Sequence, residues 1–243
     1  MVGLGTLVNI VTIVIGSLIG ILFNGGLKPK LQETIMNGLG LSVMFVGLSG
    51  ALQGLFVVDG QGLKTENMML MIVSLAIGAL VGELIDIEAK LDRVGELLKT
   101  ALRVKGEKGE NFVEGFVSSS LLFCVGAMAI IGSLNDGLSG DASMLFAKSI
   151  IDGFSAIIFA STLGIGVLFS IIPLGIYQGG ITISAKFIEP YLSDQLISNI
   201  SLIGSILIFG IGINMIFGKK IKCGNLLPAV LVPVAYECIK ALL

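Results

Sequence analysis

Apolar runs of about 20 residues fill most of this 243-residue chain, and short polar connectors separate them. A helix of about 20 apolar residues is long enough to cross the hydrocarbon core of a bilayer. The runs predict spans over 4–23, 35–57, 67–86, 112–134, 145–171, 173–188, 196–217 and 226–243, with turn residues such as Asn135-Asp136-Gly137 between them. We therefore expect an all-α polytopic transmembrane helix bundle that forms a single integral membrane domain over 1–243.

The basic residues gather in a few of the connectors. Six of the fifteen Lys and Arg lie between Ala89 and Lys108, and a basic connector marks the cytoplasmic side of a membrane protein. With eight crossings, alternate connectors carry eleven basic residues on one side and two on the other; with seven crossings, the split is nine against four. The positive-inside rule favours eight, with the segment 88–110 in the cytoplasm and both termini outside.

Two segments depart from a plain membrane-spanning helix. Between the fifth and sixth spans there is no charged connector, and Pro173, Gly175, Gly179 and Gly180 predict a Pro/Gly-broken segment near 170–181. The seven-crossing alternative arises here, if 173–188 returns to the side from which it entered. After the third span, apolar residues recur at helical spacing and basic residues lie off that stripe. This pattern predicts a cytoplasmic amphipathic helix that ends at Gly106 and Gly109. Its apolar stripe consists of Leu84, Ile87, Leu91, Val94, Leu98 and Ala101.

One ion pair is expected inside an apolar run. Polar side chains are costly in the bilayer, so they usually face a partner or a cavity. Asp152 lies well inside the fifth run, and Lys148 precedes it by one helical turn, which is the spacing of an ion pair on a helix. An internal salt bridge explains this pair as well as a carboxylate that binds a cation or carries a proton.

Five further polar residues are candidates for a solute or ion path. Glu114, Ser118 and Ser119 belong to a polar stripe on the fourth span, although close helix packing also explains the serines. Gln178 lies beside two glycines in the expected break, where freed backbone groups would bind a solute. Asn214, on the seventh span, fits either the path or a hydrogen bond to a neighbouring helix.

Two glycine pairs predict close helix contacts. Gly16 and Gly20, like Gly78 and Gly82, have the GxxxG spacing that lets membrane helices approach closely, with the partner either in this chain or in another subunit. The surrounding sequences IGSLIG and IGALVG echo one another. A second echo joins Glu114-Gly115-Phe116 to Asp152-Gly153-Phe154, which enter from opposite faces with eight crossings, as inverted halves of a transporter would. Chance similarity between glycine-rich helices explains both echoes as well.

The composition excludes several functions. The mean hydropathy of +1.00 lies outside the range of soluble domains. Because the chain has no histidine and its three cysteines lack a ligand spacing, we expect no metal site, no cofactor and no disulfide framework. The sequence contains neither a nucleotide-binding motif nor a basic face that would bind nucleic acid. We therefore expect that the protein is not an enzyme. Its expected partners are the lipid bilayer, a small solute or ion, and further copies of itself in a homo-oligomer.

The region from Phe123 to Gly180 contains distinctive sequences, namely FCVGAMAIIGSLNDGL, AKSIIDGF, FASTLGIGVLFSIIP and YQGG. Together they resemble the YqgA/YdfK-like bacterial membrane proteins, also called the domain-of-unknown-function 554 family. The resemblance implies a multi-pass protein of the bacterial cytoplasmic membrane with a role in transport. It implies no substrate and no site.

The expected function is therefore the movement of a small solute or ion across the bacterial inner membrane. The residues expected along the path are Asp152, Lys148, Glu114, Ser118, Ser119, Gln178 and Asn214. Two alternatives stay open: an oligomeric channel-like pore lined by the same residues, and a non-transporting scaffold or sensor that uses the basic amphipathic segment.

Overall fold

The computed structural model describes residues 1–24, 29–59, 62–102, 111–124, 127–188, 193–218 and 220–242. These residues group into two compact units that interleave in sequence. Unit 1 comprises Met1–Gly38 and Leu91–Tyr191, and unit 2 comprises Leu39–Lys90 and Leu192–Leu243. The expectation of a single membrane domain over 1–243 stays a prediction.

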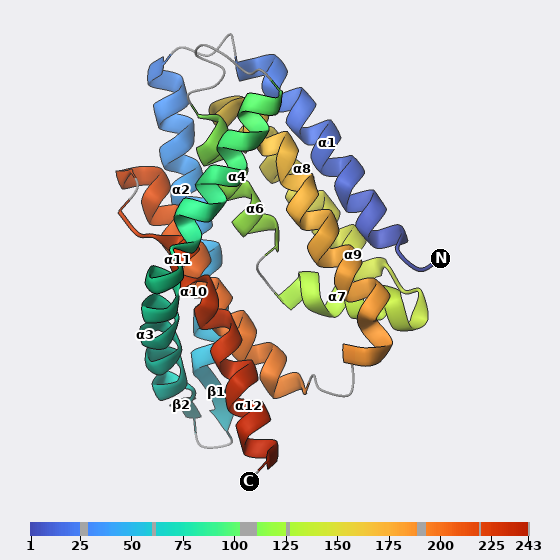
Figure 1. Cartoon of the computed structure of the whole chain (residues 1–243), viewed down its shortest axis with the longest axis vertical. Helices are drawn as coiled ribbons and strands as arrows, with labels where there is room; N and C mark the ends of the chain where they lie inside the picture. The colour runs from blue at the N-terminus through green and yellow to red at the C-terminus, as the bar shows by residue number, and fades with distance from the viewer. Residues whose placement is uncertain are drawn as a thin grey trace. The chain divides into compact units, whose positions relative to one another are not determined.

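Unit 1 is a group of packed helices (Figure 1). Its described residues form the start of α2, the later part of α4, five complete helices and a short 3-10 helix, η1. The elements are α1 (Leu4–Asn24), α2 (Pro29–Leu55), α4 (Ile87–Ala101), α6 (Phe112–Cys124), α7 (Ala127–Ser139), α8 (Ser143–Leu163), η1 (Gly164–Ser170) and α9 (Ile171–Ile188).

The first helix, α1, packs in parallel along α8 (Figure 1). A Cβ on Gly16 would lie 2.3 Å from the carbonyl oxygen of Gly153, and one on Gly20 would lie 2.2 Å from that of Ile157. Only glycine allows backbones to approach this closely. The prediction of a close contact at this GxxxG pair is confirmed, and its partner lies within the chain.

The chain reverses direction between α8 and α9. Asp152 on α8 and Gln178 on α9 both accept a hydrogen bond from Asn9 on α1. A continuous straight helix would place residues 152 and 178 about 39 Å apart, at 1.5 Å per residue. The two helices therefore fold back on each other, with η1 at the turn.

The predicted break near 170–181 is wrong in position. The helix α9 is unbroken from Ile171, and the irregular segment is the preceding η1. Pro173 is the third residue of α9, where backbone N–H groups have no partner within the helix, so its missing N–H costs nothing. The chain instead changes direction after Gly164, which ends α8 with a φ of +73°.

The fourth predicted span is also divided. The helices α6 and α7 are inclined by 60°, and Asn135-Asp136-Gly137, predicted as a connector, lies within α7. Asp136 is fully buried there, and its two carboxylate oxygens accept hydrogen bonds from the backbone N–H groups of Gly3 and Gly5. A carboxylate at a helix N-terminus satisfies free N–H groups and the positive end of the helix dipole. Asp136 thus caps α1 from another helix.

Unit 2 contains the remaining elements, which are β1 (Phe56–Asp59), β2 (Gly62–Thr65), α3 (Met68–Ile85), α10 (Asp194–Phe217), α11 (Cys223–Leu226), the 3-10 helix η3 (Leu227–Leu231) and α12 (Val232–Leu242). Its buried hydrophobic cluster joins Ala51, Leu202, Ile203 and Ala229. The second glycine pair is used here, because Gly78 packs on Ala229 and Gly82 packs on Asn225. The two segments with echoing sequences thus lie in different units, α1 in one and α3 in the other.

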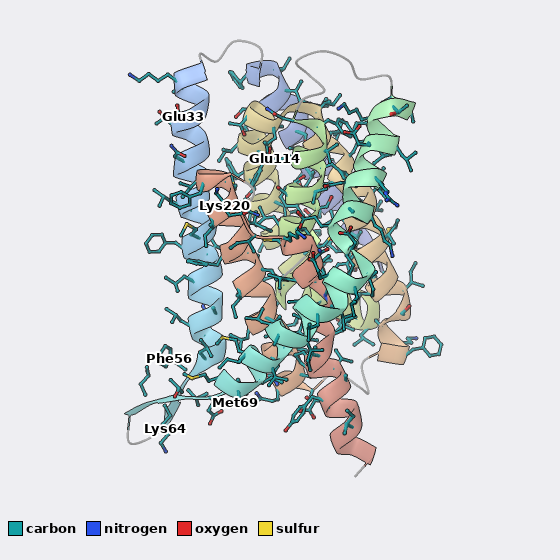
Figure 2. The ribbon with its side chains drawn as sticks, turned by 60° about the vertical axis from the view of Figure 1, so that its left-hand side comes forward. Glu33, Phe56, Lys64, Met69, Glu114 and Lys220 are labelled. Atoms are coloured by element: carbon teal, nitrogen blue, oxygen red, sulfur yellow. The ribbon has the colours of Figure 1, made fainter. Side chains whose placement is uncertain are left out.

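The prediction of an all-α fold is confirmed, with one short departure at Phe56–Asp59 and Gly62–Thr65. Two antiparallel strands pair there, with Phe56 opposite Thr65 and Val57 opposite Lys64 (Figure 2). The apolar run of α2 continues into FVVD, so hydrophobicity alone did not separate the helix from the strand. The amphipathic helix is confirmed as α4, which is separated from α3 by Asp86 in the left-handed conformation. Its predicted end at Gly106 and Gly109 lies outside the described residues.

Membrane-spanning character is clearest in α1. Its exposed stripe is apolar, with Leu7, Val11 and Leu22 exposed by 57%, 52% and 81%. Its buried face instead carries Thr6 and Asn9, the reverse of a soluble helix. In the described part of the chain, four helical stretches are long and apolar enough to cross a membrane, or five if α6 and α7 form one span. One of the four is the stretch Ser143–Phe187, which contains the α8–α9 reversal; the predicted count of eight or seven is not confirmed.

Candidate functional site

Four polar side chains from three helices of unit 1 meet in its interior. They are Asn9 on α1, Lys148 and Asp152 on α8, and Gln178 on α9, and none of them is more than 6% exposed. Asp152 lies about 14 Å along the axis of α8 from the start of that helix. We call these four residues the amide–carboxylate cluster.

Direct hydrogen bonds connect the cluster. Lys148 Nζ donates to Asp152 Oδ2, so the predicted ion pair is confirmed. Asn9 Nδ2 donates to the same carboxylate oxygen at 2.9 Å and to Gln178 Oε1 at 3.3 Å. The structure therefore brings together three of the predicted site residues, Lys148, Asp152 and Gln178.

The carboxylate fixes the orientation of both amides. An ionised carboxylate only accepts hydrogen bonds, so Asn9 must turn its nitrogen, not its oxygen, toward Asp152. Asn9 Nδ2 also donates to Gln178 Oε1, which fixes the orientation of the Gln178 amide. As a result, Asn9 Oδ1 and Gln178 Nε2 are left without a hydrogen-bond partner among the described residues, one as an acceptor and the other as a donor.

Unpartnered hydroxyls continue from the cluster toward the N-terminal end of α1. Thr6 lies one turn before Asn9 on α1, and Thr182 lies one turn after Gln178 on α9. Both are buried, as is Ser133 on α7, and no hydrogen-bond partner is described for any of the three hydroxyls. A Cβ on Gly137 of α7 would lie 2.3 Å from the carbonyl oxygen of Thr182, so α7 and α9 are in close contact here.

The predicted polar stripe on α6 has a different arrangement. Glu114 is exposed in the first turn of the helix (Figure 2), and Ser118 is half-buried. Ser119 donates its hydroxyl to the carbonyl oxygen of Gly115, one turn back on its own helix. Neither Glu114 nor Ser119 is hydrogen-bonded to the cluster. The Ser119 hydroxyl is already used within its own helix, which agrees with the interpretation that the serines serve close helix packing.

Asn214 belongs to unit 2, where both ends of its amide are used. Its Oδ1 accepts from the backbone N–H groups of Lys220 and Ile221 at 2.9 and 2.8 Å, and its Nδ2 donates to the carbonyl oxygen of Ile221 at 2.7 Å. Asn214 thus closes the turn between α10 and α11. These contacts give no support to a role in a path.

Sequence reasoning missed Asn9, although it is the residue that links the other three. A signal was present, because Thr6, Asn9 and Ser17 recur at helical spacing within an apolar run and so share one face. All three are buried in the structure. Polar periodicity inside an apolar helix was therefore as informative as charge.

The cluster is neutral overall, because one ammonium faces one carboxylate. Among the described residues, no group of three or more His, Cys, Asp or Glu side chains could hold a metal ion. Cys124, the last residue of α6, lies within electrostatic range of Lys148 and Asp152. The arrangement thus offers hydrogen bonds of fixed polarity beside an internally compensated ion pair.

Comparison with known proteins identifies relatives of similar length. A family model described as "Protein of unknown function (DUF554)" matches residues 4–237. The uncharacterized membrane protein YdfK of Bacillus subtilis (strain 168) is 33% identical over 94% of this chain and 93% of its own length. The uncharacterized protein YqgA of Escherichia coli (strain K12) is 30% identical over 94% of this chain and 93% of its own. No solved structure matches significantly. The chain belongs to the DUF554 family, and the predicted resemblance is confirmed.

Proposed function

We propose that this DUF554 protein moves a small solute or ion across the bacterial cytoplasmic membrane, and that the amide–carboxylate cluster binds it. The observation that carries the proposal is the pair of buried atoms, Asn9 Oδ1 and Gln178 Nε2, for which the described residues supply no partner. More than nine in ten buried polar groups in proteins are hydrogen-bonded, so such a pair calls for water or a solute.

The cost of the cluster supports a functional role. Leaving one buried polar atom unpaired costs about 1–3 kcal/mol, and an ionisable residue in the middle of a membrane helix costs about 2.5–3.5 kcal/mol on insertion scales. An apolar bundle would avoid both costs. Polar groups retained at this expense within membrane helices generally mark a solute, ion or proton path.

The divided helix beside the cluster supports the same proposal. Transporters commonly place their binding sites where a membrane helix is interrupted. Here α6 and α7 are inclined by 60°, and the end of α6 at Cys124 lies within electrostatic range of Lys148 and Asp152.

We also propose a threading with 88–110 in the cytoplasm and both termini outside, and the packing within unit 1 supports one part of it, the return crossing of α9. The C-terminal half of α9 contacts α7 near Gly137, and Asp136 caps the start of α1, so α9 ends where α1 begins. This arrangement favours a full return crossing for α9, as eight crossings require. A cysteine introduced at position 107 should escape external labelling in intact cells, whereas one introduced at position 61 should react; the reverse pattern would reject the threading.

Flux measurements on purified protein in liposomes test the function. Asp152→Asn should insert normally and abolish the flux that the wild-type protein supports, because it removes the charge that holds Lys148 and Asn9. Asp194→Asn, an exposed aspartate in the first turn of α10, is the matched control and should retain that flux. Flux at the wild-type level through Asp152→Asn would remove the cluster from the path.

The same assay separates the proposed carrier from the alternatives. A carrier saturates with solute concentration and responds to a gradient of a coupled ion, whereas an oligomeric pore does neither. A scaffold or sensor gives no flux. The proposal assigns no enzymatic activity to the chain.

A further inference from the structure

We infer that the amide–carboxylate cluster selects small uncharged solutes that carry a hydrogen-bond donor and an acceptor on neighbouring groups, of which carboxamides are the simplest. The inference rests on the proposed function and narrows its substrate class from any small solute or ion.

Electrostatic compensation disfavours ions at this position. The carboxylate of Asp152 is bonded directly to the ammonium of Lys148, so no net charge is left to offset the desolvation of an ion. A cation would find two available oxygens, Asn9 Oδ1 and Asp152 Oδ1, but the ammonium of Lys148 bonded to that carboxylate repels it. An anion would be attracted by that nitrogen but repelled by the Asp152 carboxylate and by Asn9 Oδ1.

Hydrogen-bond polarity favours a solute with both functions. Gln178 Nε2 requires an acceptor on the solute, and Asn9 Oδ1 requires a donor. Rotating the Asn9 amide would turn its oxygen toward the Asp152 carboxylate, and rotating the Gln178 amide would turn its nitrogen toward the nitrogen of Asn9. Neither rotation removes the requirement. A primary carboxamide presents a carbonyl oxygen and an N–H on adjacent atoms, which complements the two unpartnered atoms.

The surrounding hydroxyls are consistent with an uncharged solute. Thr6, Ser133 and Thr182 each carry a buried hydroxyl that can donate or accept, and no partner is described for any of them. A hydroxyl-lined route supplies hydrogen bonds of either polarity and no charge. Such a route replaces the water shell of a neutral polar solute far better than that of an ion.

Swelling of proteoliposomes, followed by stopped-flow light scattering, tests the selectivity with four probes: acetamide, urea, sodium chloride and sodium acetate. Acetamide and urea should enter faster than into protein-free vesicles, whereas sodium and acetate should not. Gln178→Met, which keeps the side-chain length, should lower acetamide permeability about tenfold because it removes one buried hydrogen bond to the solute. Gln178→Glu should lower it as well, because an oxygen replaces the donor nitrogen.

A matched control guards against loss of folding. Asn199 is a buried amide on α10 of unit 2, and Asn199→Leu should retain acetamide permeability. Monodisperse gel filtration and an unchanged melting temperature of Gln178→Glu show that its effect is local. Equal loss of permeability in Asn199→Leu and Gln178→Glu would overturn the inference.

The outcomes also separate this inference from the function on which it rests. Acetamide and urea permeabilities equal to those of protein-free vesicles overturn the uncharged-solute inference. If sodium or acetate then shows a flux that Asp152→Asn abolishes, transport through the cluster stands and only the substrate class is wrong. If Asp152→Asn leaves every protein-dependent flux unchanged, the proposed function fails.

Discussion

Two buried amide sites, one in each unit, differ in how completely their hydrogen bonds are made. In unit 2, Asn225 accepts from the backbone N–H of Glu88 and donates to Glu83 Oε2, both at 2.7 Å, so both ends of its amide are used. In unit 1, Asn9 and Gln178 bond to each other, and each has one amide end without a partner among the described residues. The first arrangement fastens chain segments together, whereas the second leaves hydrogen-bonding capacity for something else.

The difference shows how to separate structural from functional polar groups in this fold. A paired buried amide contributes to stability, and an unpaired amide end subtracts from it. A folded membrane protein gains nothing structural from the second kind. The contrast therefore predicts that substitutions in the two units will affect stability and flux in different combinations.

The largest effect is expected from breaking the buried ion pair. Asp152→Leu leaves the Lys148 ammonium buried without its partner, which should destabilise the protein by about 3–5 kcal/mol. The double variant Lys148→Met with Asp152→Leu should recover most of this loss, because a buried pair can often be exchanged for apolar residues. Thermal unfolding in detergent micelles measures both changes.

The exposed pair Glu83–Lys222 of unit 2 is the matched control, with both side chains 59% exposed. Replacing Lys222 there should cost much less than Asp152→Leu, because water solvates both charged groups. Flux then distinguishes the two roles of Asp152, because a double variant with full flux would show that the carboxylate only neutralises Lys148.

The glycine contacts should respond alike in both units. A Cβ on Gly82 would lie 1.8 Å from the carbonyl oxygen of Asn225, and one on Gly20 would lie 2.2 Å from that of Ile157. Because backbone atoms cannot move aside cheaply, Gly82→Ala and Gly20→Ala should each cost about 1–3 kcal/mol in thermal unfolding. Gly180→Ala is the control: beyond the backbone of its own helix, no described atom lies within 4 Å of the added Cβ, so it should stabilise α9 by about 0.5–1 kcal/mol. A destabilised Gly180→Ala would contradict the unbroken α9.

Local patterns predicted much of the structure. The length of the apolar runs located α1, α3 and α10 to within about two residues, since about 20 apolar residues in a helix match the thickness of a bilayer. The Lys148–Asp152 pair was predictable because one helical turn determines it. Pro173 misled because a proline in a first turn marks a helix start as well as a break.

Contacts between distant segments could not be predicted in this way. Asn9 meets residues 152 and 178, and no spacing rule connects positions so far apart in the chain. Asp136 was expected in a connector because Asn-Asp-Gly favours turns, but its carboxylate is held instead by the N-terminus of α1. Tertiary hydrogen bonds overrode local preference at both sites.

A smaller effect, with opposite signs for stability and flux, is expected from the unpartnered hydroxyls of unit 1. Thr6→Val and Thr182→Val keep the side-chain shape and remove a buried unpaired group, so each should stabilise the protein by about 1 kcal/mol. Each should also lower the flux, since the route loses a hydrogen-bonding group. In unit 2, Ser74→Ala removes a similar hydroxyl and should leave the flux unchanged. Unchanged flux in both threonine variants would count against the route.

The smallest expected effects are pH-dependent, and they occur at opposite ends of the pH range in the two units. In unit 1, the hydroxyl and backbone N–H of Ser143 hold the pKa of the Asp141 carboxyl below its usual value of about 3.9. A pKa that is lower in the folded state stabilises the protein at pH values above the unfolded-state pKa, and this contribution is lost as the pH falls through the folded-state pKa.

In unit 2, the hydrogen bond and charge of Glu83 raise the pKa of Lys222 above about 10.4. The contribution of Lys222 to stability is therefore present below that value and is lost as the pH rises through the raised pKa. Melting temperatures of Asp141→Ala and wild type should therefore converge only below about pH 4, and those of Lys222→Met and wild type only above about pH 10. Because both groups are exposed to water, the differences should shrink in high salt. A difference for Asp141→Ala that persisted at pH 2 would show that its effect comes from something other than the charge of the carboxylate.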